Sequence, residues 1–207
     1  MNIVKEIVEW IVCIIVALIL AFWIRYFILT PTIVKHSSMY PTLKENQRLI
    51  LDRTFRITGK KPKVGDIITF EAPGKMYSKF EVDQNNPIAL YPKRVDRLIT
   101  KFFYHILEVT KVSYIKRVVA VEGEHVEIKE GKIYINGEIL KEEYLGENVV
   151  TESSVFNDFV VPEGYVFAVG DNRSASTDCR VLGCIPLNKI EGIVVCRFWP
   201  LNEFTKY

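Results

Sequence analysis

The chain opens with a continuous apolar segment rather than with an alternating pattern. From Trp10 to Ile24 no side chain is charged. As a helix, residues 7–29 would be about 34 Å long, which is enough to cross the ~30 Å hydrocarbon core of a bilayer. No A-x-A cleavage site follows this segment, as a removable signal peptide would require. We therefore expect an uncleaved N-terminal membrane anchor over 1–29, with its transmembrane part at about 7–29.

After the anchor, apolar residues alternate with polar ones or form short β-branched runs, which is typical of strands. We expect 30–37 to be a short extended tether and the domain 30–207 to be mainly β. Asn136-Gly137 between two such runs predicts a hairpin, because a type I′ turn needs positive φ at both central residues. The expected strands are 48–51, 66–70, 114–121, 132–135, 138–140, 155–161, 164–169 and 190–199.

One segment of the domain has a helical period instead. In 93–109 the apolar residues recur at alternating spacings of three and one, which predicts an amphipathic helical insertion. Its polar face carries more basic than acidic side chains. The helix therefore either packs on the sheet, or lies against anionic lipid or over a site.

Composition narrows the function. The 27 Lys and Arg residues nearly balance 25 Asp and Glu, giving a net charge of +2, so we expect no nucleic-acid partner. Cys179, Cys184 and Cys196 lack the C-x-x-C spacing of a zinc site, and we expect neither a metal nor another cofactor. Cys179 and Cys184 could pair, but three buried thiols are the preferred interpretation.

Hydroxyl groups are concentrated in two stretches that could carry catalysis, 37–43 and 170–180. A serine hydroxyl is a weak nucleophile and needs a base. His105 and His125 lie in sequences typical of the surface, and His36 is too close to Ser38 along the chain to place its ring easily on that hydroxyl. A Ser-His-Asp triad is therefore disfavoured.

A neutral lysine can replace histidine as the base, because burial lowers the pKa of its ammonium group. Lys116 lies inside an apolar strand, and Arg117 would point to the opposite face. The alternative is an edge lysine whose head reaches water. Ser113 and Lys116 also match the S-x-x-K motif of β-lactamases, but the S-D-N and K-T-G elements are missing and the sequence there is β-like.

Five motifs in order behind the anchor resemble the type I signal peptidases over almost the whole chain. They are S-M-x-P-T-L at 38–43, G-D-I-x-x-F at 65–70, Y-x-K-R-V at 114–118, G-D-N-R-x-x-S-x-D-x-R at 170–180, and G-C-I-P at 183–186. The resemblance implies a β-rich catalytic core and a membrane-anchored serine endopeptidase. Its substrates would be secretory preproteins with A-x-A-type signal peptides, and membrane lipid would be a further partner.

The resemblance also implies roles for individual residues. Ser38 corresponds to the nucleophile, with its backbone N–H in the oxyanion hole, and Lys116 to the general base. Ser176 corresponds to the hydroxyl that orients the lysine amine, and Asp178 and Arg180 to a supporting ion pair. Residues that match substrate-pocket walls are Val34, Met39, Leu43, Tyr114 and Ile115.

Two residues depart from the family pattern: His36 replaces the usual Gly or Ser, and Cys179 replaces a Ser. Basic residues are more numerous after the anchor than before it, which by charge alone would put the domain in the cytoplasm. The resemblance instead implies a single-pass cell-membrane protein with an extracytoplasmic catalytic domain. Two alternatives are a silent relative that only binds substrate and a self-cleaving regulator with the same dyad.

Overall fold

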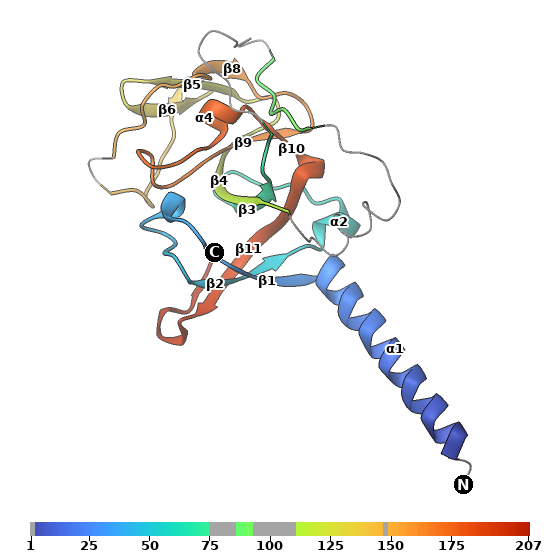
Figure 1. The fold of residues 1–207 in the computed structure, drawn as a ribbon. Coiled ribbons are helices and arrows are strands. Elements are labelled where there is room, and N and C mark those ends of the chain that lie inside the picture. The colour runs from blue at the N-terminus through green and yellow to red at the C-terminus, as the bar shows by residue number, and fades with distance from the viewer. Residues whose placement is uncertain (1–2, 75–85, 93–110, 147–148) are drawn as a thin grey trace.

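A long helix projects from a β-rich body in the computed structural model (Figure 1). The predictions of a mainly β fold and of an N-terminal apolar helix are confirmed. The predicted helix at 93–109 falls outside the residues that the structure describes. The described residues are 3–74, 86–92, 111–146 and 149–207.

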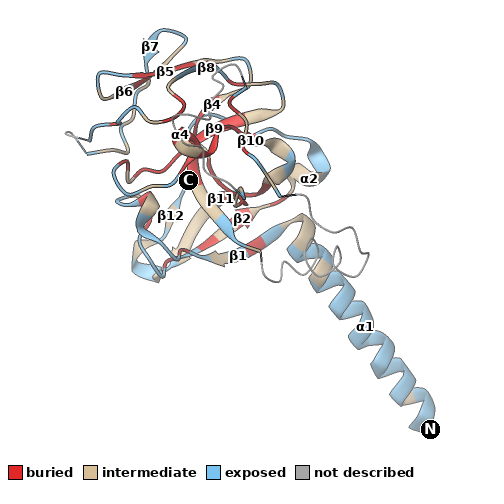
Figure 2. Cartoon of the chain, turned by 45° about the horizontal axis from the view of Figure 1, so that its top comes forward, coloured by how far each residue is buried: buried red, intermediate tan, exposed pale blue. Residues whose placement is uncertain are grey.

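Helix α1 (Ile3–Phe27) has 25 residues. Its most apolar stretch of 18 residues has a mean hydropathy of 2.8, and no residue of that stretch is buried. It is therefore exposed along its length in Figure 2, and it is long and apolar enough to cross a membrane. The helix ends at Phe27, two residues before the predicted end of the span. The helix ends there because the following residues join the sheet, where Leu29 pairs with Asp52. The Thr30 hydroxyl donates to the Arg25 carbonyl of the last helical turn at 2.5 Å.

The main sheet has the strand order β1-β2-β11-β3-β4-β9-β10, with β12 paired to β11, and all of these pairs are antiparallel. The expected tether is corrected here, because residues 29–33 form the edge strand β1. Pro31 is tolerated there, since an edge strand has one side without ladder hydrogen bonds. The bounds are β1 (Leu29–Ile33), β2 (Arg48–Asp52), β3 (Ile67–Glu71), β4 (Ser113–Val121), β9 (Tyr165–Val169), β10 (Ile185–Pro186), β11 (Ile190–Trp199) and β12 (Thr205–Lys206).

A smaller sheet has the order β7-β6-β5-β8. Asn136 (φ 53°) and Gly137 (φ 85°) form its predicted hairpin turn. The segment from His125 begins a strand, in which the His125 ring contacts the exposed Asp158 carboxylate at 2.8 Å. The strand predicted at 155–161 is shorter. The bounds are β5 (His125–Lys129), β6 (Lys132–Ile135), β7 (Glu138–Ile139) and β8 (Asp158–Val160).

Short helices connect the strands. They are α2 (Phe55–Thr58), α4 (Cys179–Leu182) and the 3-10 helices Ser37–Met39, Leu187–Lys189 and Leu201–Glu203. Cys179 and Cys184 are buried free thiols, and Cys196 is a half-buried one.

The described residues form two apolar clusters in the body, whose buried strands are red in Figure 2. The larger packs Phe70, Phe156 and Phe167 between the two sheets. The smaller includes Met39 and Leu43 and lies directly beneath Ser38. A fully buried side chain of this kind contributes roughly 1.5–3 kcal/mol, so the segment around Ser38 is held by its own packing.

Candidate active site

Ser38 lies in the middle of a 3-10 turn that is fastened on both sides. Below it, Met39 and Leu43 are completely buried, and the Leu43 N–H donates to the Met39 carbonyl at 2.8 Å. Above it, the Asn172 backbone N–H donates to the Ser38 carbonyl at 3.0 Å, and the Asn172 amide donates to the Ser37 carbonyl at 3.1 Å. The position of the hydroxyl is therefore fixed before any substrate arrives.

Lys116 reaches this hydroxyl from strand β4. Its Nζ lies 2.7 Å from Ser38 Oγ and 2.9 Å from the Ile115 carbonyl oxygen, although 78 positions separate the two side chains along the chain. Only 3% of Lys116 is exposed. The prediction of a buried lysine is thus confirmed, and the edge-lysine alternative is excluded.

Burial lowers the pKa of Lys116 from 10.5 to about 8. The charge of Asp178 acts in the opposite direction and keeps the pKa from falling further. With a pKa of about 8, roughly one molecule in ten has a neutral amine at pH 7. The charged form donates to Ser38 Oγ, whereas the neutral form can accept the proton of that hydroxyl, which is what a general base requires.

Ser176 is close to the pair, but the contact expected from the resemblance is not made. Its Oγ is buried and has no hydrogen-bond partner among the described residues. Gly170 lies between it and Ser38, because a Cβ there would collide with both Ser176 Oγ and the Ser38 carbonyl. Glycine at 170 therefore lets two serines approach the same point.

Asp178 and Arg180 form the predicted ion pair. Arg180 Nε and Nη2 each donate to the carboxylate at 2.9 Å, and both residues are buried. Asp178 also accepts the Gly170 N–H at 3.0 Å and caps α4 through the Arg180 N–H. The pair therefore shapes the loop at 170–180 and does not contact the Ser38 hydroxyl.

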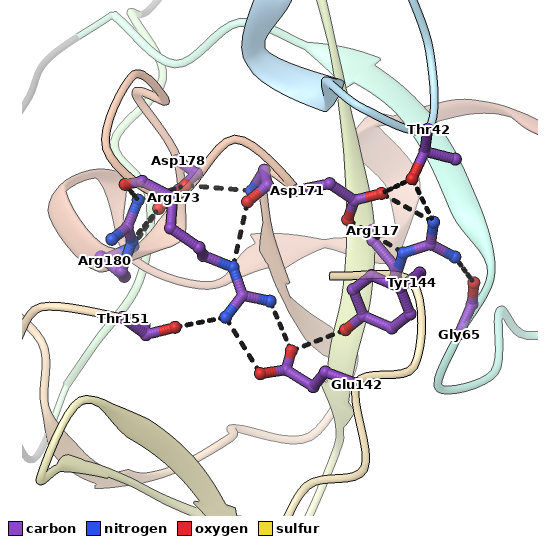
Figure 3. Close-up of polar contacts among 11 residues, drawn as sticks. Thr42, Gly65, Arg117, Glu142, Tyr144, Thr151, Asp171, Arg173, Asp178 and Arg180 are labelled. Carbon is purple, nitrogen blue, oxygen red and sulfur yellow. Dashed lines mark hydrogen bonds and ion pairs between the residues drawn. The ribbon is translucent and has the colours of Figure 1, made fainter. Parts of the chain in front are cut away.

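A second buried ion pair supports the same loop and was not predicted. Arg117 donates to the two Asp171 oxygens at 3.0 and 2.7 Å, and the Thr42 hydroxyl donates to the same carboxylate at 2.6 Å (Figure 3). The Arg117 guanidinium also stacks 3.9 Å from the centre of the Tyr144 ring. The strand period indicated that Arg117 points away from the face that carries Lys116. It could not identify Asp171 as the partner, because Asp171 lies 54 positions away in the sequence.

Arg173 continues this network. Its Nε donates to the Gly170 carbonyl at 3.1 Å, and its remaining nitrogens contact Glu142 and Thr151 (Figure 3). Since Glu142 and Thr151 come from the segment after β7, the loop is connected to the small sheet as well. Among the described residues no cluster of three His, Cys, Asp or Glu side chains is suited to a metal.

A groove of about 770 Å³ opens at the Ser38–Lys116 pair. One side is formed by residues 32–38 and the other by residues 111–116. Three of the predicted pocket residues line it, namely Val34, Tyr114 and Ile115. The other two, Met39 and Leu43, are fully buried beneath it and do not line it.

Comparisons with known proteins identify the family of the chain. Residues 7–199 match the family model described as signal peptidase, peptidase S26. The chain is 32% identical to signal peptidase IB of Staphylococcus aureus, over 97% of this chain and 93% of that protein. It is also 32% identical to signal peptidase I of Bacillus licheniformis, over 96% and 91%. A solved signal peptidase I of Enterococcus faecalis is 26% identical, covering 65% of this chain and 97% of the other, with a TM-score of 0.41.

The class is that of the serine endopeptidases, because these relatives are type I signal peptidases. More specifically, the chain belongs to the signal peptidase family, peptidase S26. The sequence resemblance is thereby confirmed.

The close approach at Gly170 gives a first prediction. Gly170→Ala should lower activity by about tenfold or more, because the added methyl group pushes apart Ser176 and the Ser38 carbonyl. Cleavage of a preprotein and thermal unfolding should be measured together. The matched control is Gly146→Ala, where the nearest atom to an added Cβ is an ordinary 3.8 Å away. Equal effects of the two substitutions would contradict a tight fit specific to Gly170.

Proposed function

We propose that the protein is a membrane-anchored serine endopeptidase that cleaves N-terminal signal peptides, with Ser38 as nucleophile and Lys116 as general base. The observation that carries the proposal is the 2.7 Å contact between Lys116 Nζ and Ser38 Oγ, made by an ammonium group that burial pushes towards its neutral form. Membership of the signal peptidase family supplies the reaction class.

In the first step the neutral Lys116 amine takes the Ser38 proton while Oγ attacks the scissile carbonyl carbon. The Ser38 backbone N–H stabilises the oxyanion, and such a donor contributes about 3–4 kcal/mol. The resulting ammonium gives its proton to the leaving amine as the peptide bond breaks. A water molecule, deprotonated by the same amine, then hydrolyses the ester and restores Ser38.

Ser176, Asp178 and Arg180 have supporting roles in this proposal. The buried Ser176 hydroxyl lacks a described partner, and it is available to hold the Lys116 amine once Ser38 Oγ has become bonded to substrate. Such a hydroxyl fixes a neutral amine without supplying the negative charge that would raise its pKa. The Asp178–Arg180 ion pair keeps the loop in place around these groups.

The substrate is proposed to bind as an extended strand between the two edges of the groove. Main-chain hydrogen bonds would then provide affinity with little demand on sequence. Val34, Tyr114 and Ile115 narrow the groove, so small side chains such as those of an A-x-A sequence are favoured over large ones. His36 lies in the groove wall, where it is a candidate to influence the second oxyanion donor.

The anchor and its orientation complete the proposal. Residues 1–29 hold the chain in the membrane, and 30–207 form an extracytoplasmic catalytic domain, since signal peptides are removed after their proteins have crossed. Supporting this arrangement, α1 is exposed along its length and apolar throughout its central part. The proposal puts the domain on the outer side of the membrane, although by charge alone the basic residues that follow the helix would put it in the cytoplasm.

Substitution of the two reacting groups tests the chemistry. Ser38→Ala and Lys116→Ala should each reduce preprotein cleavage in detergent to less than about a hundredth of the wild-type rate, because each removes one member of the proton-transfer pair. Circular dichroism should show a folded domain. The matched controls, Ser153→Ala and Lys132→Ala, change exposed residues and should retain activity. Substantial cleavage by either dyad variant would contradict the assignment.

The acid side of the pH profile should follow deprotonation of Lys116. Below a pKa of about 8 the rate should rise about tenfold per pH unit, and it should level off above it, because only the neutral amine accepts a proton. The measurement is kcat/KM for a peptide without titratable groups. A flat rate between about pH 5 and 9 would exclude a lysine base.

Topology can be tested in intact cells. Protease added from outside should degrade the region after residue 29 and leave a fragment containing α1, whereas a cytoplasmic marker protein should remain whole. Protection of the domain until the cells are lysed would overturn the proposed orientation.

A further inference from the structure

A second pocket, of about 540 Å³, lies where α1 meets the domain. Tyr26 and Phe27, the last residues of α1, form one wall, and α2 contributes Phe55 and Arg56. Figure 1 shows α2 beside the C-terminal end of α1. The pocket does not contain the Ser38–Lys116 pair, and its use is not explained by peptide cleavage.

The junction at this pocket is built by specific contacts. The Arg56 guanidinium donates to the Tyr26 carbonyl at 3.1 Å and lies 4.7 Å from the centre of the Tyr26 ring. On the other side, the Arg53 N–H donates to the Ile28 carbonyl at 2.8 Å. The pocket is therefore formed before a ligand binds, and its position relative to the end of α1 is fixed.

Five of the six charged residues among the described lining residues are basic, and Glu71 is the acidic one. Three of its lysines have carboxylate partners: Lys61 with Glu122 at 2.5 Å, Lys111 with Glu191 at 2.6 Å, and Lys189 with Glu71 at 3.0 Å. An ammonium group has three N–H donors, so one ion pair leaves donors on Lys61 and Lys189 for another anion. The basic lining residues are Arg56, Lys60, Lys61, Lys111 and Lys189.

We propose that this pocket binds the phosphate of an anionic phospholipid headgroup. The proposal rests on the membrane anchoring proposed above. Aromatic residues at the end of a membrane helix mark the lipid–water interface, so Tyr26 and Phe27 place the pocket at headgroup level. Ile57, 58% exposed on α2, adds an apolar contact for the acyl region beside the basic groups. A phosphate in this position accepts charge-assisted hydrogen bonds from the basic side chains. An anionic headgroup is favoured over a zwitterionic one, because it carries no positive group of its own to oppose their charge.

The test is a lipid titration of the full chain in detergent micelles. Short-chain phosphatidylglycerol is added, and bound lipid is counted by native mass spectrometry. The triple variant Lys60→Gln, Lys61→Gln, Lys189→Gln should bind about tenfold more weakly than wild type. The matched control, Lys132→Gln, Lys141→Gln, Lys206→Gln, removes the same charge from exposed positions elsewhere and should bind like wild type. Cleavage of a soluble peptide by both variants verifies that they are folded.

Three results would overturn the proposal. Equal loss of binding in both triple variants would indicate general charge attraction rather than a site. Equal binding of phosphatidylcholine would show that an anionic headgroup is not selected. Equally tight binding of glycerol 3-phosphate would assign the pocket to a soluble phosphate. Anchoring is tested separately, because alkaline carbonate releases a chain that is not embedded in the membrane, whatever the titration shows.

Discussion

The structure depends on one unfavourable arrangement, an ammonium group buried against a serine hydroxyl. A pKa of about 8 instead of 10.5 for Lys116 corresponds to about 3 kcal/mol that folding must supply whenever the amine is charged. This cost in folding free energy is fully present below pH 8, where Lys116 is charged in both the folded and the unfolded chain. It disappears as the pH rises to 10.5, the pKa of Lys116 in the unfolded chain, because between these two values the unfolded chain still binds a proton that the folded chain has lost. The rest of the domain therefore has to hold Lys116 beside Ser38 strongly enough to offset it.

The two faces of strand β4 both help to hold Lys116 beside Ser38. Lys116 points to the Ser38 hydroxyl, and Arg117, its neighbour, points the other way and forms a two-fold hydrogen-bonded pair with Asp171. Asp171 belongs to the loop whose next residue, Asn172, binds the Ser38 carbonyl. Two consecutive residues of one strand thus position both the Lys116 amine and the loop that holds the Ser38 carbonyl. Buried ion pairs of this kind define a geometry more than they add stability.

The limits of sequence reasoning follow from the same contacts. The strand period placed Lys116 in an apolar environment, and the turn chemistry of Asn136 and Gly137 located a hairpin, because both are local properties. The edge strand at residues 29–33 was missed, since its identity depends on pairing with β2, and Pro31 obscured its pattern. Met39 and Leu43 show a further limit: similarity to pocket positions does not distinguish a residue that lines a groove from one that supports it from below. The role of Arg117 similarly required a partner 54 positions away.

The direct connection from α1 to β1 also constrains how the site can meet a membrane. From Phe27 to Ser38 the extended chain covers no more than about 40 Å, and residues 29–33 of it are fixed in the sheet. With Thr30 and Arg56 hydrogen-bonded to the last turn of α1, Ser38 cannot move far from the end of the helix. Lys111 lines both the groove and the basic pocket beside α1, so the two cavities are adjacent. Lipid bound in the pocket would therefore lie next to the entrance of the groove, on the side from which a membrane-embedded signal peptide would approach.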